Sequence, residues 1–285
     1  MEMVKYSFFL LSPHYGISPA TTLSNIMQKL PLIFLSCLVA CGQSSDQQTT
    51  TTVKDNTTTD APATYYKTIG EIPVPEGYKR VPAGAGSFDE WARTIPLKKE
   101  KTVYLYNGTK KRNQAAQYAV VDIPTGKQDL QQCADVVMRL RAEYLFSHKK
   151  YNEIAFMDYT GKWYKWERGN DRPAFDRYLQ TVFGWCGSAS LEKQLTSVPD
   201  FNNIKAGDVL VQGGFPGHAM IVVDLAVNAN GKKVYMMVQG YQPAQDMHVL
   251  VNPQSETGSP WYEVTNEKDI TTPEWQFTQQ NLKTW

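Results

Sequence analysis

Three apolar segments between Ile204 and Gln239 constrain the fold more than any other part of the chain. Residues 209–212, 219–225 and 234–239 are short and rich in Val, Ile and Met, and a Gly/Pro break and an Asn230-Gly231 turn separate them. Such segments are typical of β-strands joined by tight connections. The sequence therefore predicts three consecutive strands, with a hairpin between the second and the third.

His218 stands at the mouth of the second predicted strand and is a candidate functional residue. A titratable side chain is costly inside an apolar core but is tolerated at the end of a strand. If the hairpin pairs Val227 with Lys232, His218 lies opposite Tyr241 and diagonal to Gln239, on the same face of the sheet. We therefore expect Gln239 to orient the imidazole of His218.

Cys133 lies upstream, in a segment whose apolar residues recur with the spacing of an amphipathic helix. We expect Asp129 to cap this helix and Cys133 to lie in its first turn. There the helix dipole and the unpaired N–H groups favour thiolate over thiol. The apolar stripe comprises Leu130, Cys133, Val137, Leu140 and Tyr144.

The order of these features resembles the NlpC-type and CHAP-type members of the papain-like cysteine peptidase and amidase superfamily. The resemblance covers roughly residues 128–242 and depends on the helix-start cysteine and on the motifs GDVLV and GHAMIVV. It implies an α+β fold with a papain-like (NlpC-type) core over about 128–251, in which the cysteine helix packs on an antiparallel sheet. It also implies that Cys133 is the nucleophile and His218 the base. The backbone N–H of Cys133, helped by Gln132, would then stabilise the oxyanion.

The whole chain also resembles an uncharacterised family of bacterial lipoproteins, a domain of unknown function. The motifs that carry this second resemblance are QQCADVVMRLRAEYL, PGHAMIVVD, QPAQDMHVL and PWY. It implies a location in the cell envelope and supplies no activity.

The N-terminal quarter has the layout of an exported, lipid-anchored protein. Residues 1–26 are interpreted as an upstream mis-start, and 27–41 as a lipoprotein signal peptide that ends in Leu-Val-Ala-Cys41, similar to a lipobox. Lipidation of Cys41 would anchor the protein to a membrane, facing the periplasm. An ordinary secretory signal, or a buried apolar segment in a badly started gene, is the alternative. Residues 42–64 are rich in Thr, Gln and Ser and are expected to be a disordered tether.

Residues 65–285 are predicted to form a single α+β domain with an N-terminal family-specific addition. We expect helices that begin near Ser87, at the cysteine segment, near Pro173 and near Ser188. We expect further strands at 102–106, 118–123, 154–157 and 247–251, and a terminal helix or extended arm over 273–282.

For these candidate site residues, purely structural roles remain as alternatives to functional ones. Cys133 is a nucleophile, a disulfide partner of Cys186, or a buried small residue. Among the aromatic residues, Trp163, Trp166 and Tyr241 either line a substrate cleft or plug the edge of the core. Another histidine, His248, is expected to be exposed, and no metal-ligand spacing is found.

A formal net charge of +1 on 285 residues argues against nucleic-acid binding. The first hypothesis is a cysteine amidase or peptidase, without a cofactor, that acts on cell-wall or other envelope peptides. The alternative is a non-catalytic binding or scaffold lipoprotein. The sequence leaves the oligomeric state open.

Overall fold

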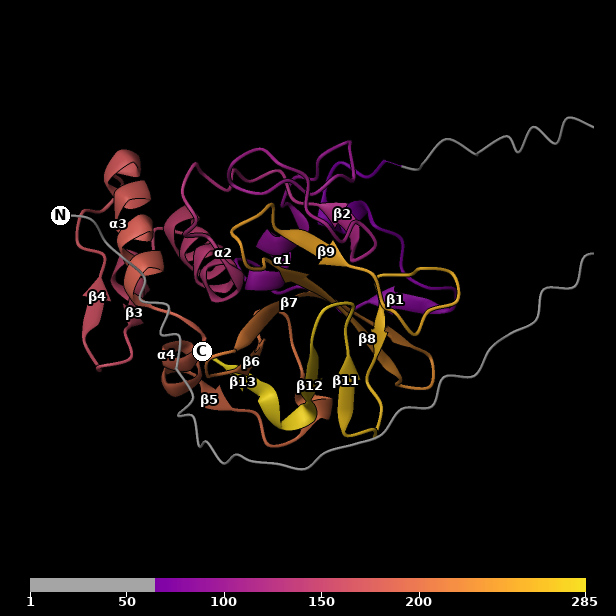
Figure 1. Cartoon of the computed structure of the whole chain (residues 1–285). Coiled ribbons are helices and arrows are strands. Elements are labelled where there is room, and N and C mark those ends of the chain that lie inside the picture. The colour runs from indigo at the N-terminus through magenta and orange to yellow at the C-terminus, as the bar shows by residue number, and fades with distance from the viewer. Residues whose placement is uncertain (1–64) are drawn as a thin grey trace, which may run out of the picture. The chain divides into compact units, whose positions relative to one another are not determined.

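The computed structural model describes residues 65–285, which belong to one compact unit. Figure 1 shows this part in colour. The expected mis-start, signal peptide, lipidation site Cys41 and tether all lie outside the described residues.

A nine-stranded sheet dominates the described chain, and every neighbouring pair of its strands is antiparallel. The strand order is β2-β9-β8-β7-β6-β13-β5, with β1 also paired to β7 and β10 to β8. The strands are β1 (Tyr78–Arg80), β2 (Gln117–Val120), β5 (Thr196–Ser197), β6 (Val209–Gln212), β7 (His218–Asn228), β8 (Lys233–Gln239), β9 (His248–Leu250), β10 (Tyr262–Glu263) and β13 (Leu282–Thr284).

Helices and two small hairpins complete the fold. The α-helices are α1 (Phe88–Arg93), α2 (Cys133–Ser147), α3 (Arg172–Trp185) and α4 (Ser188–Gln194). The 3-10 helices are η1 (Ile69–Glu71), η2 (Tyr151–Glu153), η3 (Phe201–Asn203) and η4 (Gln279–Asn281). One hairpin pairs β3 (Ala155–Met157) with β4 (Trp163–Lys165), and the other pairs β11 (Asp269–Thr271) with β12 (Gln276–Thr278).

The predicted fold class is wrong. We expected an α+β, papain-like core, whereas the chain is built mostly of antiparallel strands in one large sheet with few helices. The expected N-terminal addition is an integral part of this sheet, because β1 pairs with the central strand β7. The order of local motifs therefore did not determine the topology.

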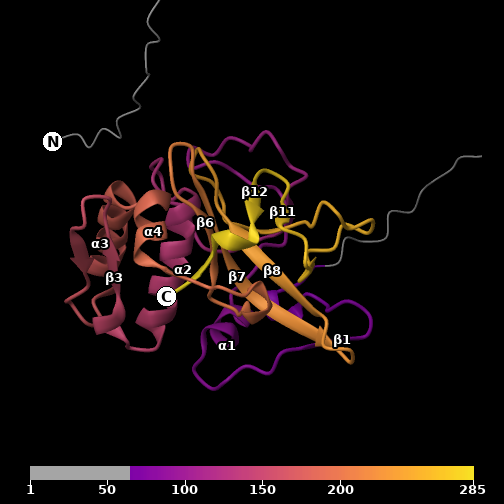
Figure 2. The ribbon, with the colours of Figure 1, turned by 90° about the horizontal axis from the view of Figure 1, so that it is seen from below.

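The two faces of β7 belong to two different core layers. Ala219, Ile221 and Val223 lie in the same apolar cluster as residues of α2, α3 and α4. Met220 and Val222 lie in the other cluster, with residues of β11 and β12. Figures 1 and 2 show the three helices gathered on one side of the sheet. Because side chains alternate along a strand, His218 belongs to the face of the β11–β12 hairpin.

A β-bulge between Val222 and Asp224 sets the register of the central hairpin. Near the turn, Val227 pairs with Lys233 rather than with the predicted Lys232. Beyond the bulge the register agrees with the prediction, since Ile221 pairs with Val238. The single extra residue in β7 accounts for both observations.

The carboxylate of Asp224, beside this bulge, is completely buried and forms ion pairs with two arginines. Arg80 of β1 and Arg93 at the end of α1 approach its two oxygens at 2.6 and 2.8 Å. A buried charge needs such partners to offset its desolvation. This cluster attaches the N-terminal segment of the domain to the central strand.

Other predicted elements have mixed outcomes. The helix with Pro173 in its first turn is confirmed as α3, and Ser87 caps α1 by accepting a hydrogen bond from the N–H of Glu90. Residues 102–106 form isolated bridges instead of a strand. Of the two alternatives for 273–282, the α-helix is wrong and the extended arm is closer to the structure, because this segment contributes β12, η4 and the start of β13.

Candidate functional site

Cys133 is the first residue of α2, and Gln132 is the N-cap. The backbone N–H of Gln132 donates to Oδ2 of Asp135 at 2.9 Å. The predicted cap, Asp129, is wrong: its Oδ1 accepts from the backbone N–H of Ala244 at 2.7 Å. The thiol is thus fixed at the very start of the helix, as expected from the sequence, although a different residue caps it.

A close backbone contact joins the start of α2 to the end of β8. A Cβ atom at Gly240 would lie 2.6 Å from Cγ2 of Val136 and 3.0 Å from the carbonyl oxygen of Gln132. Only glycine permits this approach without displacing one of the two segments. Gly240 therefore seats Cys133 beside Gln239, the last residue of β8.

Cys133 is 6% exposed, so its thiol is buried at the start of α2. Burial raises its pKa to about 11, and the charge of Asp135 adds to this rise. The backbone N–H groups of Cys133, Ala134 and Ala219 oppose it without reversing it. The pKa thus moves opposite to the direction predicted from the helix start, because desolvation outweighs the helix terminus.

Cys186 does not form a disulfide with Cys133, since both thiols are free. Cys186 is buried at the C-cap of α3, and burial raises the pKa of its thiol to about 12. The alternative in which Cys133 forms a disulfide with Cys186 is therefore not what the structure shows.

His218 makes the predicted contact with Gln239. Its Nε2 lies 2.9 Å from Oε1 of Gln239, and the imidazole is 2% exposed. Burial lowers the pKa of His218 to about 4; the Gln239 bond opposes this shift, and the charge of Lys111 adds to it. The imidazole is therefore neutral at neutral pH and able to accept a proton.

The other ring nitrogen of His218, Nδ1, makes no hydrogen bond within residues 65–285. No hydrogen bond joins it to Sγ of Cys133 within the same residues, although the backbone N–H of the next residue, Ala219, is close enough to that thiol to influence its pKa. Catalytic hydrogen bonds are often long in unliganded sites and tighten when substrate binds.

Three aromatic rings surround the imidazole of His218. The ring of Tyr241 lies 5.0 Å from it, that of Trp275 5.2 Å and that of Phe277 5.9 Å, between centroids. Tyr241, one of the residues predicted to line a cleft, thus lies next to the imidazole. The other two rings belong to the β11–β12 segment, whose role was not predicted.

The sequence reasoning also missed a buried polar network behind Gln239. Its amide Nε2 lies 3.1 Å from Nε2 of His248 and donates to Oε2 of Glu274 at 2.8 Å. Lys111 pairs with the same carboxylate oxygen. The expected exposure of His248 is wrong, because its side chain is completely buried.

The remaining predicted site residues lie in other surroundings. The side-chain amide of Gln132 donates to Asp129, and its oxygen accepts from Gln242, so it stays at the start of α2. Trp166 is 4% exposed and packs in the aromatic core of α2 and α3, while Trp163 on β4 is 48% exposed. Neither tryptophan contacts the imidazole.

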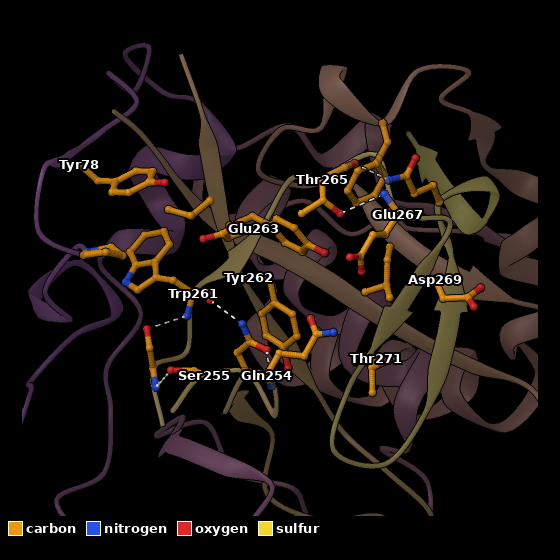
Figure 3. A pocket seen from close by; sticks show the side chains of 18 residues that line it. Tyr78, Gln254, Ser255, Trp261, Tyr262, Glu263, Thr265, Glu267, Asp269 and Thr271 are labelled. Atoms are coloured by element: carbon orange, nitrogen blue, oxygen red, sulfur yellow. Dashed lines mark hydrogen bonds between the residues drawn. The ribbon is translucent and has the colours of Figure 1, made fainter. Parts of the chain in front are cut away.

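A pocket of about 490 Å³ lies elsewhere on the described chain, and neither Cys133 nor His218 lines it. Figure 3 shows its carboxylates, Glu263, Glu267 and Asp269, together with Tyr78 and Trp261. It borders the first residues of β8, whereas Gln239 ends that strand, roughly 15 Å away at the usual rise per residue. The pocket is therefore separate from the thiol and the imidazole.

Residues 65–285 contain neither a candidate metal site nor a helix that could span a membrane. No group of three or more His, Cys, Asp or Glu side chains is arranged to hold a metal ion. Among the same residues, no helix combines the length and the apolar character that spanning a membrane requires.

Comparison with known proteins identifies a family without an assigned activity. No curated protein and no solved structure matches the chain, and nothing in the comparisons supports the resemblance to NlpC-type or CHAP-type proteins. One family matches over residues 69–173 and 157–284, which together span nearly all of the described chain. The chain therefore belongs to the family described as "Domain of unknown function (4846)".

Proposed function

We propose that this protein is a cysteine hydrolase that cleaves an amide or peptide bond, with Cys133 as nucleophile, His218 as general base and Gln239 as the residue that orients the base. The observation that supports this most is the hydrogen bond between Nε2 of His218 and Oε1 of Gln239. An amide oxygen only accepts hydrogen bonds, so Nε2 must carry the proton. The unprotonated Nδ1 is then available to the thiol.

The reaction follows from these protonation states. Sγ of Cys133 attacks the carbonyl carbon while its proton passes to Nδ1 of His218. The imidazolium then gives that proton to the departing amine, and a thioester remains on Cys133. Water, deprotonated by His218, hydrolyses the thioester and restores the thiol. Because the pKa of the thiol is raised, the resting site holds the protonated thiol, which must give its proton to His218 before or during attack.

The start of α2 supplies donors for the oxyanion. The backbone N–H of Cys133 lies in the first turn of the helix, where backbone N–H groups lack helical partners. The side-chain amide of Gln132 is held next to it by Asp129 and Gln242. Donors preorganised in this way stabilise the charge that develops on the carbonyl oxygen.

The proposed substrates are cell-wall or other envelope peptides, because the proposed anchor would hold the domain at the envelope. This part of the proposal depends on the sequence Leu-Val-Ala-Cys41 and the polar segment that follows it. A lipid on Cys41 would attach the protein to a membrane, with the domain facing the periplasm.

A non-catalytic binding or scaffold protein is the second candidate function. The burial of the site favours it, since Cys133 is 6% exposed and His218 2% exposed. A buried, protonated thiol is chemically inert unless substrate reaches it. The two candidates therefore differ in whether a carbonyl compound can acylate Cys133 in the folded protein.

Acyl transfer from p-nitrophenyl acetate distinguishes the two candidates. A hydrolase should release p-nitrophenol, with an acetyl group detectable on Cys133 by peptide mass spectrometry. Cys133→Ala and His218→Ala should each reduce this release by several orders of magnitude. The double variant should be little worse than either, because the two groups act as a unit.

Cys186→Ser is the matched control, because it removes the other buried thiol of the described chain. It should leave acyl transfer unchanged. If the folded wild-type protein acquires no acetyl group on Cys133, but does so after unfolding in urea, the hydrolase proposal is wrong and the scaffold is favoured.

A further inference from the structure

The side-chain amide of Gln239 is held at both of its ends. Its oxygen faces Nε2 of His218 at 2.9 Å. Its nitrogen faces Nε2 of His248 at 3.1 Å and Oε2 of Glu274 at 2.8 Å. The Gln239 side chain is completely buried, so these three contacts are the only partners available to it within the described chain.

The tautomer of His248 is determined by the backbone. Its Nδ1 lies 3.0 Å from the carbonyl oxygen of Asp246, and a carbonyl oxygen can only accept. Nδ1 of His248 therefore carries the proton. Complete burial lowers the pKa of this histidine to about 3, so the ring is neutral and its Nε2 is an acceptor. That acceptor needs an N–H donor, which the amide of Gln239 supplies.

Glu274 supplies the second acceptor, from the turn between β11 and β12. Its carboxylate is charge-paired with Lys111 and also accepts from Nδ2 of Asn113 at 3.2 Å. The Lys111 side chain is 6% exposed and that of Glu274 11%, so the pair is nearly enclosed. A carboxylate in this setting accepts an N–H group and repels an amide oxygen.

If the side-chain amide of Gln239 were rotated so that its oxygen and nitrogen exchanged places, all three contacts would be unfavourable. Its oxygen would face the lone pair of His248 and the carboxylate of Glu274, and its NH₂ group would face Nε2–H of His218. Buried polar groups left in such contacts are strongly unfavourable. The orientation of the amide is thus fixed by groups that do not touch His218.

We propose that Glu274 and His248 are positioning residues: by holding both amide protons of Gln239, they force its oxygen onto Nε2–H of His218 and keep Nδ1 of His218 unprotonated. The role of Nδ1 as the acceptor of the Cys133 proton rests on the proposed function. The tautomer itself does not, and it can be measured without a substrate.

Nitrogen NMR of protein labelled with ¹⁵N-histidine reads the tautomers directly. The chain has four histidines, so His218 and His248 can be assigned by substituting each in turn. In the wild-type protein at neutral pH, His218 should be the Nε2–H form and His248 the Nδ1–H form. Two buried histidines that share one amide should thus show opposite tautomers.

Two substitutions test the positioning. Glu274→Gln replaces a group that only accepts with one that can accept or donate, and His248→Phe removes the other acceptor. Each variant should retain mostly the Nε2–H form of His218, because one constraint remains. The double variant should show a substantial share of the Nδ1–H form. Asn113→Ala is the control: it removes a hydrogen bond to the same carboxylate without touching Gln239, and the tautomers should not change.

The acetyl-transfer assay then links the tautomer to chemistry. The acetylation rate of Cys133 should fall in proportion to the population of the Nε2–H form that is lost. The largest possible loss is about 10²–10⁴-fold, which is the usual contribution of a general base to rate. The Nδ1–H form of His218 in the wild-type protein would overturn the proposal. So would an unchanged tautomer in a folded double variant. Correct tautomers without acetylation would instead refute the hydrolase function and leave the positioning role of Glu274 and His248 intact.

Discussion

The thiol of Cys133 should titrate far above neutral pH, and its alkylation by iodoacetamide tests this. Burial and the charge of Asp135 raise its pKa from the ordinary value of 9.0 to about 11. A rise of two pKa units lowers the thiolate fraction about 100-fold at a given pH, which corresponds to about 3 kcal/mol. At pH 7, roughly one molecule in 10⁴ then carries a thiolate at this position.

The assay follows the Cys133 peptide by mass spectrometry over a pH series. Because only the thiolate reacts, the logarithm of the alkylation rate should rise with a slope of about one per pH unit from about pH 6 to about pH 9. In urea, the alkylation rate of the same peptide should level off as the pH approaches 9.0, the ordinary pKa of the thiol. The rate must also be proportional to the iodoacetamide concentration, which excludes limitation by opening of the fold.

A plateau at neutral pH in the folded protein would refute this reasoning. It would mean that Cys133 is already a thiolate, paired with the imidazolium of His218, and that the helix terminus outweighs desolvation. A slope of one together with acetylation by p-nitrophenyl acetate would show that the resting site holds a protonated thiol, which loses its proton before or during attack.

Three further outcomes are expected. Gly240→Ala should lower the free energy of unfolding by about 1–3 kcal/mol, because the new Cβ would lie 2.6 Å from Cγ2 of Val136. Gly187→Ala, which meets nothing within 4 Å, should change it little in the same urea titration, and equal losses would contradict the steric argument. Stability should fall as the pH drops from about 6.5 towards about 3, because the unfolded chain binds protons at His218 and His248 that the folded chain excludes. His248→Gln should flatten this dependence by up to about 5 kcal/mol, and an unchanged slope in acid titrations would argue against the lowered pKa. Cys41→Ser should release the protein from membranes, and unchanged membrane fractionation would refute the lipid anchor.

The features that local pattern determines were predictable from the sequence. Residues 209–212 form β6 as expected, and β7 and β8 differ from the prediction only at their ends. The contact of His218 with Gln239 followed from strand alternation alone. It held even though the pairing near the turn was off by one residue, because the bulge in β7 restores the predicted register towards the site. The alternation of side chains is thus a sound guide over short distances in a hairpin.

The network behind Gln239 could not be predicted, because its members look like surface residues in the sequence. Glu274 stands in a polar stretch, and His248 is a polar residue in a short predicted strand whose partners the sequence does not show. Only long-range pairing buries them: β9 lies next to β8, and the turn after β11 folds over the same face. Propensity and periodicity carry no information about such contacts. The pKa of Cys133 was misjudged for a related reason. The helix start is a local feature that the sequence shows, whereas the desolvation that dominates comes from the surrounding fold.

The separate origins of the two halves of the site imply that they can be perturbed independently. The position of the thiol depends on the close packing of Gly240 against the start of α2. The orientation of the imidazole depends on Gln239 and on the two acceptors that hold its amide. A substitution at Gly240 that leaves the protein folded should therefore change the acetylation rate of the thiol without changing the tautomer of His218. The double variant of Glu274→Gln and His248→Phe should change the tautomer of His218 without changing the rate at which the thiol reacts with iodoacetamide at high pH. If either variant changed both the reactivity of the Cys133 thiol towards iodoacetamide and the tautomer of His218, the two halves would move together. The site would then have to be treated as one rigid unit.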